Sequence, residues 1–376
     1  MKILFAGGGT AGHINPAIAV ASYIKQKQPD SQILFCGNPH GMEASLVPKA
    51  GFDFTPIKVK GFQRQINLRN IKNNAMAVAY LATASARARQ IIKDFSPDIV
   101  MGTGGYVSGP VVRKAAQMGI KTVTHEQNAF PGVTTKLLSK HVDKILLAVP
   151  EAKKYLGDCD DRCVVTGNPI RGSVLKADRD ISRIELGIPD DKVCILSFGG
   201  SLGARRINEA IADLMAWHYK RGKIWHIHAT GSYGVELFPA LLKEKGVDVS
   251  GCRNISIREY IDDMPRCLAA ADLVISRAGA ITLSEIEAAG RASILIPSPN
   301  VAENHQYHNA MALYNRNAAV VIEEKDLTGE MLCKQVEELI SDPFTLRHLG
   351  NNARSMAIID SNERIYREIL KLLKDR

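Results

Sequence analysis

The chain of 376 residues lacks several features that mark whole classes of protein. Its longest stretches without a charged residue lie between Lys72 and Arg87 and between Asp98 and Arg113. Both are shorter than the ~20 residues that a membrane-spanning helix needs. The apolar residues after Lys2 are interrupted at once by three glycines, unlike the apolar core of a signal peptide. We therefore expect neither an integral membrane protein nor an exported one.

The chain also lacks the residue pairs of common metal and redox sites. Its seven cysteines, at positions 36, 159, 163, 194, 252, 267 and 333, contain no C-x-x-C pair, which zinc ribbons and redox dithiols require. We find no Asp-x-Asp motif at the end of an expected strand. With 45% hydrophobic and 23% charged residues, the composition indicates a globular protein with reduced thiols and no metal centre.

Acidic residues are scarce in one segment, and this scarcity explains most of the net charge of +9. Between Lys49 and Lys93 there are nine basic residues and one acidic residue, Asp53, which leaves 9 − 1 = +8. Apolar residues such as Phe62 alternate with the basic ones. This pattern over residues 62–93 favours docking on an anionic membrane surface. A nucleic acid is the rival partner, but no nucleic-acid motif is present. The third interpretation is a solvated helix face whose apolar side belongs to the core.

Short apolar segments alternate with helix-period segments along the whole chain. The expected strands in the first half are Lys2–Ala6, Gln32–Cys36, Asp53–Ile57, Asp98–Met101, Thr122–His125 and Lys144–Ala148. Those in the second half are Val193–Phe198, Ile224–Ala229, Asn254–Arg258, Asp272–Ser276, Ser293–Pro297 and Ala319–Ile322. Such alternation predicts α/β architecture with parallel sheets covered on both faces.

The pattern is interrupted once, near Val165–Arg171, where a Gly-Asn-Pro sequence stands. We therefore predict two doubly wound, Rossmann-like domains that face a cleft. Ligands of such folds bind at the carboxyl ends of the strands. After Pro343 only amphipathic helix remains. We place the first domain at residues 1–166, the second at 167–355 and a C-terminal helix at 356–376, which we expect to return toward the first domain.

Glycine-rich loops follow the first strand of each expected domain. The first reads GGGTAGH over residues 7–13 and formally satisfies G-x-G-x-x-G. A dinucleotide site would also need an acidic residue at the end of the second strand, but that strand ends in Cys36, Gly37 and Asn38. The loop is therefore either a tight turn without a ligand or a place where a substrate approaches the backbone. In the second case His13 lies at a helix N-terminus, where the helix dipole favours a neutral base.

The second loop reads SFGGSLGAR over residues 197–205. Its backbone N–H groups and the following helix can hold a diphosphate, and the missing Gly-Lys-Ser/Thr argues against triphosphate hydrolysis. A third cluster, residues 276–285, ends in Glu285, which is either a ribose ligand or an ordinary helix glutamate. Polar clusters at 102–110, 125–128 and 303–306 also follow expected strands.

Together these motifs resemble the MurG family of peptidoglycan N-acetylglucosaminyltransferases, in order and over nearly the entire chain. The family's Gly-Gly-Thr-Gly-Gly-His loop corresponds to residues 8–13, with Ala11 where many members carry glycine. The similar segments that follow are residues 104–110, 125–128, 167–171, 199–204, 261–264, 277–285 and 305–307. The resemblance implies a GT-B glycosyltransferase that moves N-acetylglucosamine (GlcNAc) from UDP-GlcNAc to lipid I, undecaprenyl-diphosphate-MurNAc-pentapeptide, to give lipid II.

The resemblance also implies the site residues. Uracil would lie by Ile261 and Arg171, the ribose by Glu285 and the diphosphate by Ser201. The complete set of expected substrate-binding residues is Thr10, Ala11, Gly12, Asn128, Arg171, Ser201, Ile261, Ala280, Ile281, Thr282, Leu283, Ser284, Glu285 and Gln306. On the acceptor side we expect Gly104, Gly105 and Tyr106.

The implied reaction inverts the anomeric centre, so one displacement suffices. His13 is the expected general base, because its ordinary pKa lies near working pH, and Glu126 is the alternative. Backbone N–H groups after Ser201 would stabilise departing UDP. We expect no cofactor and no metal. Since lipid I lies in the cytoplasmic leaflet, we expect a peripheral protein on the cytoplasmic face of the membrane.

Other functions remain open from the residues alone. A different GT-B enzyme, such as a glycolipid synthase, would differ in its acceptor, and a UDP-GlcNAc epimerase would need none. A non-catalytic nucleotide-sugar-binding protein is disfavoured by the intact His13 and both glycine loops.

Overall fold

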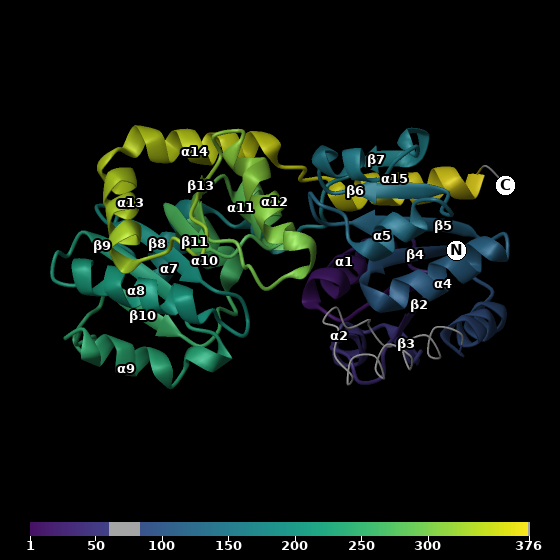
Figure 1. The fold of residues 1–376 in the computed structure, drawn as a ribbon, viewed down its shortest axis with the longest axis horizontal. Helices are drawn as coiled ribbons and strands as arrows, with labels where there is room; N and C mark the ends of the chain where they lie inside the picture. Colours follow the sequence, from purple (N-terminus) through teal and green to yellow (C-terminus); the bar gives the residue numbers. More distant parts are fainter. Residues whose placement is uncertain (60–82, 375–376) are drawn as a thin grey trace. The chain divides into compact units, whose positions relative to one another are not determined.

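The structure is a computed structural model that describes residues 1–59 and 83–374. The chain divides into two units, which are described separately (Figure 1). Unit 1 comprises residues 1–170 and 360–376, and unit 2 comprises residues 171–359. Within the described residues, no helix is both long enough and apolar enough to cross a bilayer.

Unit 1 is built on a parallel sheet of seven strands in the order β3-β2-β1-β4-β5-β6-β7. Helices connect consecutive strands, and residues 83–95 are also helical. The elements are β1 (Lys2–Gly7), α1 (Ala11–Lys27), β2 (Gln32–Gly37), α2 (Glu43–Lys49), β3 (Asp53–Pro56), β4 (Ile99–Gly104), α4 (Gly105–Gln117), β5 (Lys121–Glu126), α5 (Val133–Leu138), β6 (Lys144–Leu147), 3₁₀ turns at Pro150–Tyr155 and Asp160–Arg162, β7 (Cys163–Val165) and α15 (Ser361–Lys374).

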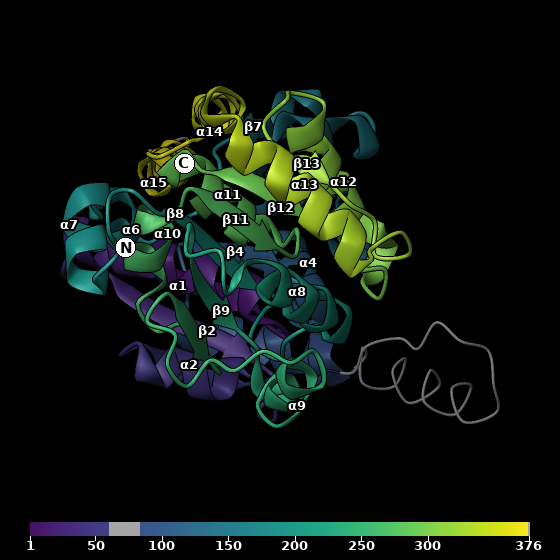
Figure 2. The same ribbon diagram turned by 90° about the vertical axis from the view of Figure 1, so that its left-hand side faces the viewer.

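Unit 2 contains a parallel sheet of six strands in the order β10-β9-β8-β11-β12-β13. Helix α14 packs against both α11 and β12 (Figure 2). The elements are α6 (Gly172–Lys176), α7 (Arg179–Leu186), β8 (Val193–Phe198), α8 (Arg205–His218), β9 (Ile224–Ala229), a 3₁₀ turn at Ser232–Gly234, α9 (Leu237–Glu244), β10 (Ile255–Arg258), α10 (Met264–Ala270), β11 (Leu273–Ser276), α11 (Ala280–Ala289), β12 (Ala292–Leu295), a 3₁₀ turn at Ala302–Asn304, α12 (His305–Tyr314), β13 (Val320–Val321), α13 (Gly329–Ser341) and α14 (Pro343–Met356).

The predicted α/β class and the two parallel sheets are confirmed, and every expected strand is present within a few residues. One strand was missed. β7 has three residues and pairs with β6 at the edge of the first sheet, where the sequence analysis expected the domain break to begin. The chain passes between the units at residues 170 and 171 and again at 359 and 360. Residues 167–170 lie with unit 1 because Gly167 and Asn168 bond to Leu147 and Gln127 of that unit.

Helix α15 ends the chain but packs within unit 1 (Figure 1). Its apolar residues Ile365, Ile369 and Leu372 join the buried cluster formed by β1 and α1. Its first residue, Ser361, donates its hydroxyl to the Asn168 carbonyl oxygen at 2.7 Å. The last helix therefore supports the loop that follows β7.

Of the expected docking segment, residues 62–93, the structure describes only the part that belongs to the helix at residues 83–95, and residues 60–82 lie outside the described residues. Its apolar residues Ala84, Ala88, Ile91 and Ile92 belong to the core. Its basic residues Arg87, Arg89 and Lys93 are exposed. In this part of the segment, the interpretation of a solvated helix face with a core-facing apolar side is the one that the structure supports.

A chain of buried histidines crosses the core of unit 2. The Ser197 hydroxyl lies 2.8 Å from both His226 Nε2 and His228 Nδ1, and His218 Nε2 lies 2.9 Å from His226 Nδ1. All three rings are fully buried. Burial lowers the pKa of His218 to about 4 and that of His228 to about 3, and it also lowers the pKa of His226. The folded state therefore holds these rings neutral.

We expect the stability of unit 2 to fall as the pH decreases from about 6.5 toward the lowered pKa values. In that range the unfolded chain takes up protons that the folded chain does not. For each such histidine, the free energy of unfolding then decreases by up to about 1.4 kcal/mol for each unit by which the pH falls. Urea unfolding on either side of pH 6.5 measures this loss. The loss of unfolding free energy at low pH should be smaller for His218→Gln. It should be unchanged for His348→Gln, because His348 is an exposed histidine of the same unit. Equal pH dependence of the unaltered protein and both variants would contradict the explanation.

Candidate active site

The two glycine motifs of unit 1 are in direct contact. β1 and β4 are neighbours in the sheet, and the strand order reverses between them, which is the switch point where ligands bind in such folds. Gly105, with φ +76°, packs so closely on the Gly8 carbonyl oxygen that a Cβ atom would collide with it. Gly104 has φ +104°, and a Cβ atom there would lie 2.6 Å from His13 Nδ1. These glycines therefore make room for the loop and for the His13 ring.

A buried carboxylate binds the first glycine loop and the end of β2 through their backbone N–H groups. Glu43, the first residue of α2, is 1% exposed. Its oxygens accept hydrogen bonds from the backbone N–H groups of Gly9, at 3.1 Å, and Asn38, at 2.9 Å. No acidic residue stands at the end of β2 in the sequence, and Glu43 reaches this place only through tertiary packing. Because the Gly9 amide is already paired with a carboxylate, this loop is poorly suited to binding a phosphate through that amide.

His13 is one end of a chain of polar side chains. Its Nδ1 lies 3.0 Å from Gln127 Oε1. Gln127 Nε2 lies 2.9 Å from His125 Nδ1, and His125 Nε2 lies 3.0 Å from the Gly167 carbonyl oxygen. His125 is fully buried, and this desolvation lowers its pKa. The sequence analysis noted the cluster at 125–128 but assigned no role to Gln127.

Glu126 has its carboxylate engaged in the loop after β5. One oxygen accepts from the backbone N–H of Asn128, at 3.1 Å, and from its side-chain amide, at 3.0 Å. The other accepts from the Gly132 N–H at 3.0 Å, and the residue is 3% exposed. This arrangement shapes the loop that carries Asn128.

The other expected residues of unit 1 lie at the same edge of the sheet as His13. Thr10 and Gly12 are exposed at the start of α1, and Ala11 is half-buried. Tyr106 is 56% exposed at the start of α4. These residues all lie at the carboxyl edge of this sheet: Gly104 is the last residue of β4, and Thr10, Ala11, Gly12, Gly105, Tyr106 and Asn128 lie in loops or first turns of helices.

The second glycine loop precedes α8 in unit 2. Gly200 and Gly203 have φ values of +97° and +84°, and no side chain caps the N-terminus of the helix. The loop after β9 is tied to it, because the Ser232 and Tyr233 N–H groups donate to the carbonyl oxygens of Ser201 and Leu202. Ser201 is exposed. The uncapped helix end beside an exposed hydroxyl is suited to a diphosphate.

Arg171 and Glu285 form a bidentate ion pair within unit 2. Arg171 Nε and Nη2 donate to the two carboxylate oxygens of Glu285 at 2.7 and 2.9 Å. The Glu285 hydrogen bond raises the pKa of Arg171. The Glu285 side chain is only 8% exposed, so the arginine balances a nearly buried charge. Both residues belong to the expected donor site, and their pairing is a feature that only the structure shows.

The first turn of α11 presents its backbone more than its side chains. Ala280, Ile281 and Thr282 are half-buried. The Leu283 side chain faces the interior, since the residue is only 3% exposed. Its backbone N–H donates to the Gly279 carbonyl oxygen. The Ser284 hydroxyl donates to the Ala280 carbonyl oxygen at 3.2 Å. Ile261, after β10, is 2% exposed, which leaves its backbone as the group for a ligand.

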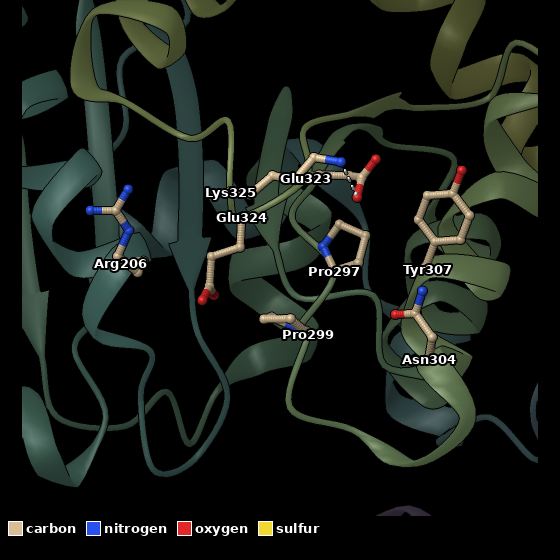
Figure 3. Close-up of a pocket in the computed structure, with 8 residues that line it drawn as sticks. All are labelled: Arg206, Pro297, Pro299, Asn304, Tyr307, Glu323, Glu324 and Lys325. Carbon is tan, nitrogen blue, oxygen red and sulfur yellow. Dashed lines mark ion pairs between the residues drawn. The ribbon is translucent and has the colours of Figure 1, made fainter.

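A cavity of about 350 Å³ opens at the carboxyl ends of β12 and β13 (Figure 3). It is lined by Arg206, Pro297, Pro299, Asn304, Tyr307, Glu323, Glu324 and Lys325. Gln306 connects α12 to the loop after β12 beside this cavity, since the Gln306 Oε1 accepts a hydrogen bond from the Ser298 N–H at 2.9 Å. Glu303 and Asn304 both have positive φ, at +54° and +49°, and such strain is typical of binding sites. The sequence analysis missed most of this lining, which no motif marks.

The fold and the two glycine loops define a class of protein. Residues 3–147 match the glycosyltransferase family 28 N-terminal domain, and residues 194–365 match the family 28 C-terminal domain. Solved UDP-GlcNAc 2-epimerases, such as that of Neisseria meningitidis, share the fold with a TM-score of 0.65 at 14% identity, over 99% of this chain and 100% of theirs.

Comparison with individual proteins narrows the class. The chain is 47% identical, over 100% of its length and 99% of the relative's, to the UDP-N-acetylglucosamine--N-acetylmuramyl-(pentapeptide) pyrophosphoryl-undecaprenol N-acetylglucosamine transferase of Acetivibrio thermocellus. It is 41% identical to the Clostridioides difficile enzyme of the same name, over 99% and 89%. The crystal structure of Acinetobacter baumannii MurG matches with a TM-score of 0.76 at 28% identity, over 98% and 99%. The chain belongs to the MurG family.

We expect Gly104→Ala to lower the turnover number of glycosyl transfer by about 100-fold, because a Cβ atom there displaces the His13 ring. Gly119→Ala is the matched control. Gly119 also has a positive φ, of +73°, but no atom lies within 4 Å of the place where its Cβ atom would stand. Both variants place a Cβ atom at a positive φ, but Gly104 also has a ψ of −176°, a conformation nearly confined to glycine. The melting temperatures of the two variants report this backbone strain, and equal turnover numbers for the two would contradict the steric explanation.

Proposed function

We propose that the protein transfers GlcNAc from UDP-GlcNAc to the 4-hydroxyl of the MurNAc sugar of lipid I, which yields lipid II. The observation that carries this proposal is the 47% identity, over the full length, with a transferase named for these substrates. The reaction forms the lipid-linked disaccharide unit of peptidoglycan. Unit 1 holds the acceptor and unit 2 holds the nucleotide sugar.

The donor lies along the carboxyl edge of the second sheet. The loop before α8 and Ser201 hold the diphosphate through N–H groups and the hydroxyl. Glu285 binds the ribose hydroxyls, since a carboxylate oxygen accepts two hydrogen bonds and one per oxygen is already used by Arg171. The Ile261 backbone contacts uracil. The two Nε2–H groups of Gln306 suit a sugar hydroxyl while its Oε1 holds Ser298.

His13 is the general base. It takes the proton of the acceptor hydroxyl while the oxygen attacks the anomeric carbon and the bond to UDP breaks, so the configuration inverts. Glu126 is less suited to this role, because three N–H donors already occupy its carboxylate. A positioned base contributes about 10²- to 10⁴-fold to the rate.

Departing UDP gains negative charge, which the positive end of the α8 dipole and its uncapped N–H groups stabilise. This stabilisation is supplied by the chain itself. We therefore infer that transfer needs no metal ion and no cofactor.

The test is UDP release from UDP-GlcNAc with and without a lipid I analogue, in the presence and absence of EDTA. We expect release only with the analogue, a disaccharide product, and substantial activity in EDTA. Isomerised donor without acceptor would identify an epimerase instead. Donor binding without acceptor-dependent release would indicate another acceptor, such as a glycolipid precursor, and complete loss in EDTA would contradict metal independence.

The protein acts at the cytoplasmic face of the membrane as a peripheral protein, and residues 62–93 are its docking surface. The described helix at residues 83–95 contributes only its basic face to this surface, because its apolar side lies in the core. Support comes from the net charge of residues 49–93, from the exposed Arg87, Arg89 and Lys93, and from a substrate anchored by a polyprenyl chain. Basic groups near an anionic surface each contribute about 1 kcal/mol of attraction.

We expect the triple change Arg64→Glu, Arg69→Glu and Lys72→Glu to weaken binding to vesicles that contain anionic lipid, and to do so more at low salt, because the attraction is electrostatic. Vesicle co-sedimentation measures the effect. The matched control makes the same charge change at exposed lysines of unit 2, Lys220, Lys243 and Lys334. Equal binding of the two triple variants would contradict the assignment of the surface.

A further inference from the structure

Gln127 lies between the catalytic-base candidate and the interior of unit 1. It is 4% exposed. Its Oε1 is 3.0 Å from His13 Nδ1. Its Nε2 is 3.0 Å from the Thr103 carbonyl oxygen and 3.1 Å from the His125 carbonyl oxygen. The side chain thus joins the first turn of α1 to the carboxyl ends of β4 and β5.

The partners of Gln127 determine which way its amide is turned. A backbone carbonyl oxygen can only accept a hydrogen bond. Because two such oxygens face one end of the amide, that end is the NH₂ donor and the other end is the oxygen. The oxygen in turn can only accept, so His13 Nδ1 must carry a hydrogen. In a neutral ring, Nε2 then holds the lone pair.

The hydrogen bonds of His125, on the other side of Gln127 from His13, agree with this orientation of the amide. His125 Nε2 faces the Gly167 carbonyl oxygen at 3.0 Å, so Nε2 carries the hydrogen. Complete burial lowers the pKa of His125 and keeps its ring neutral. Its Nδ1 is therefore an acceptor, 2.9 Å from Gln127 Nε2. The two Nε2 hydrogens serve the Thr103 carbonyl oxygen and, shared, the carbonyl oxygen and Nδ1 of His125. Asn168 donates to the Gln127 carbonyl oxygen, and Ser361 of α15 donates to the Asn168 carbonyl oxygen, which holds the backbone around this network.

We propose that Gln127 is a positioning residue that fixes His13 in the tautomer with hydrogen on Nδ1, so that Nε2 is the atom that receives the acceptor's proton. This proposal deepens the proposed function, because it rests on His13 being the base. During transfer the acceptor O–H proton moves to Nε2, and the oxygen bonds to the anomeric carbon. The carbon–oxygen bond to UDP breaks, and its electron pair leaves with UDP.

The neutral amide has a specific consequence for the imidazolium that forms. Its oxygen accepts the Nδ1 hydrogen before and after proton transfer, so the ring need not turn. A carboxylate at this place would stabilise the imidazolium more strongly. It would also put a charge beside the Thr103 carbonyl oxygen, which now accepts a hydrogen bond from Gln127.

The kinetic test compares Gln127→Met with Gln127→Glu. We expect Gln127→Met, which has no acceptor, to lower kcat by about 10- to 100-fold with little change in the KM for UDP-GlcNAc. Gln127→Glu keeps an acceptor for Nδ1 and should lose less of kcat than Gln127→Met, although its second carboxylate oxygen meets the Thr103 and His125 carbonyl oxygens without a hydrogen. The acidic limb of its kcat–pH profile should move to higher pH. Gln117→Met, at an exposed glutamine of α4, is the matched control and should keep the original kcat. Equal losses of kcat and unmoved pH profiles in both Gln127 variants would overturn the proposal.

A double-mutant cycle separates positioning from a general loss of structure. If Gln127 acts through His13, the variant His13→Ala/Gln127→Met should be no slower than His13→Ala alone. Multiplicative losses would show an independent effect and would overturn the proposal. The melting temperature of each variant reports whether unit 1 remains folded.

A direct observation of the tautomer distinguishes failure of this inference from failure of the proposed function. In ¹⁵N-histidine-labelled protein, the His13 signals are those absent from His13→Ala. We expect a protonated Nδ1 and an unprotonated Nε2 in the neutral ring, and a mixture of tautomers in Gln127→Met. A hydrogen on Nε2 in the unaltered protein would overturn the inference itself. The expected tautomer together with full activity of His13→Ala would instead show that His13 is not the base.

Discussion

The contact of Gly105 with the Gly8 carbonyl oxygen is the constraint on which the arrangement of unit 1 depends. Adjacent parallel strands bring their carboxyl ends to one edge of the sheet, so the loops after β1 and β4 have to share the same space. Only residues without a Cβ atom allow the two backbones to approach so closely. The same lack of side chains leaves room for the His13 ring beside Gly104. The steric requirement of the switch point and the position of the base therefore have one cause.

Buried polar groups then hold the loops in place. Glu43 and Glu126 each bind two or more backbone or side-chain amide donors, and both are nearly inaccessible to water. A buried carboxylate is tolerable only when it is hydrogen-bonded in this way. In unit 2 the same rule explains the Arg171–Glu285 pair, where the charge that suits a ribose is balanced by a guanidinium. Each site thus consists of exposed groups supported by satisfied buried ones.

The periodicity of the sequence was sufficient to predict nearly the whole fold. Strand β1 and helix α1 are examples, because a buried parallel strand is a short apolar run and its covering helix repeats every 3.6 residues. β7 escaped prediction because three half-buried edge residues carry almost no pattern. The unit boundary lies four residues later than expected. The Gly-Asn-Pro sequence indicates a turn, but it does not record the hydrogen bond from Asn168 to the Gln127 carbonyl oxygen, which holds this turn in unit 1.

The amino-acid sequence by itself determined which residues stand at the ends of strands, and so it determined the glycine loops, His13, Ser201 and Glu285 as candidates. The tertiary structure decided which groups those residues meet. Glu43 is 34 positions from Gly9, and Gln127 is 114 positions from His13, separations at which no local pattern records a contact. Hydrogen-bond partners, and with them the orientation of an amide and the tautomer of an imidazole, depend on distances of about 3 Å. Only the packed sheet and its supporting helices set distances of that kind.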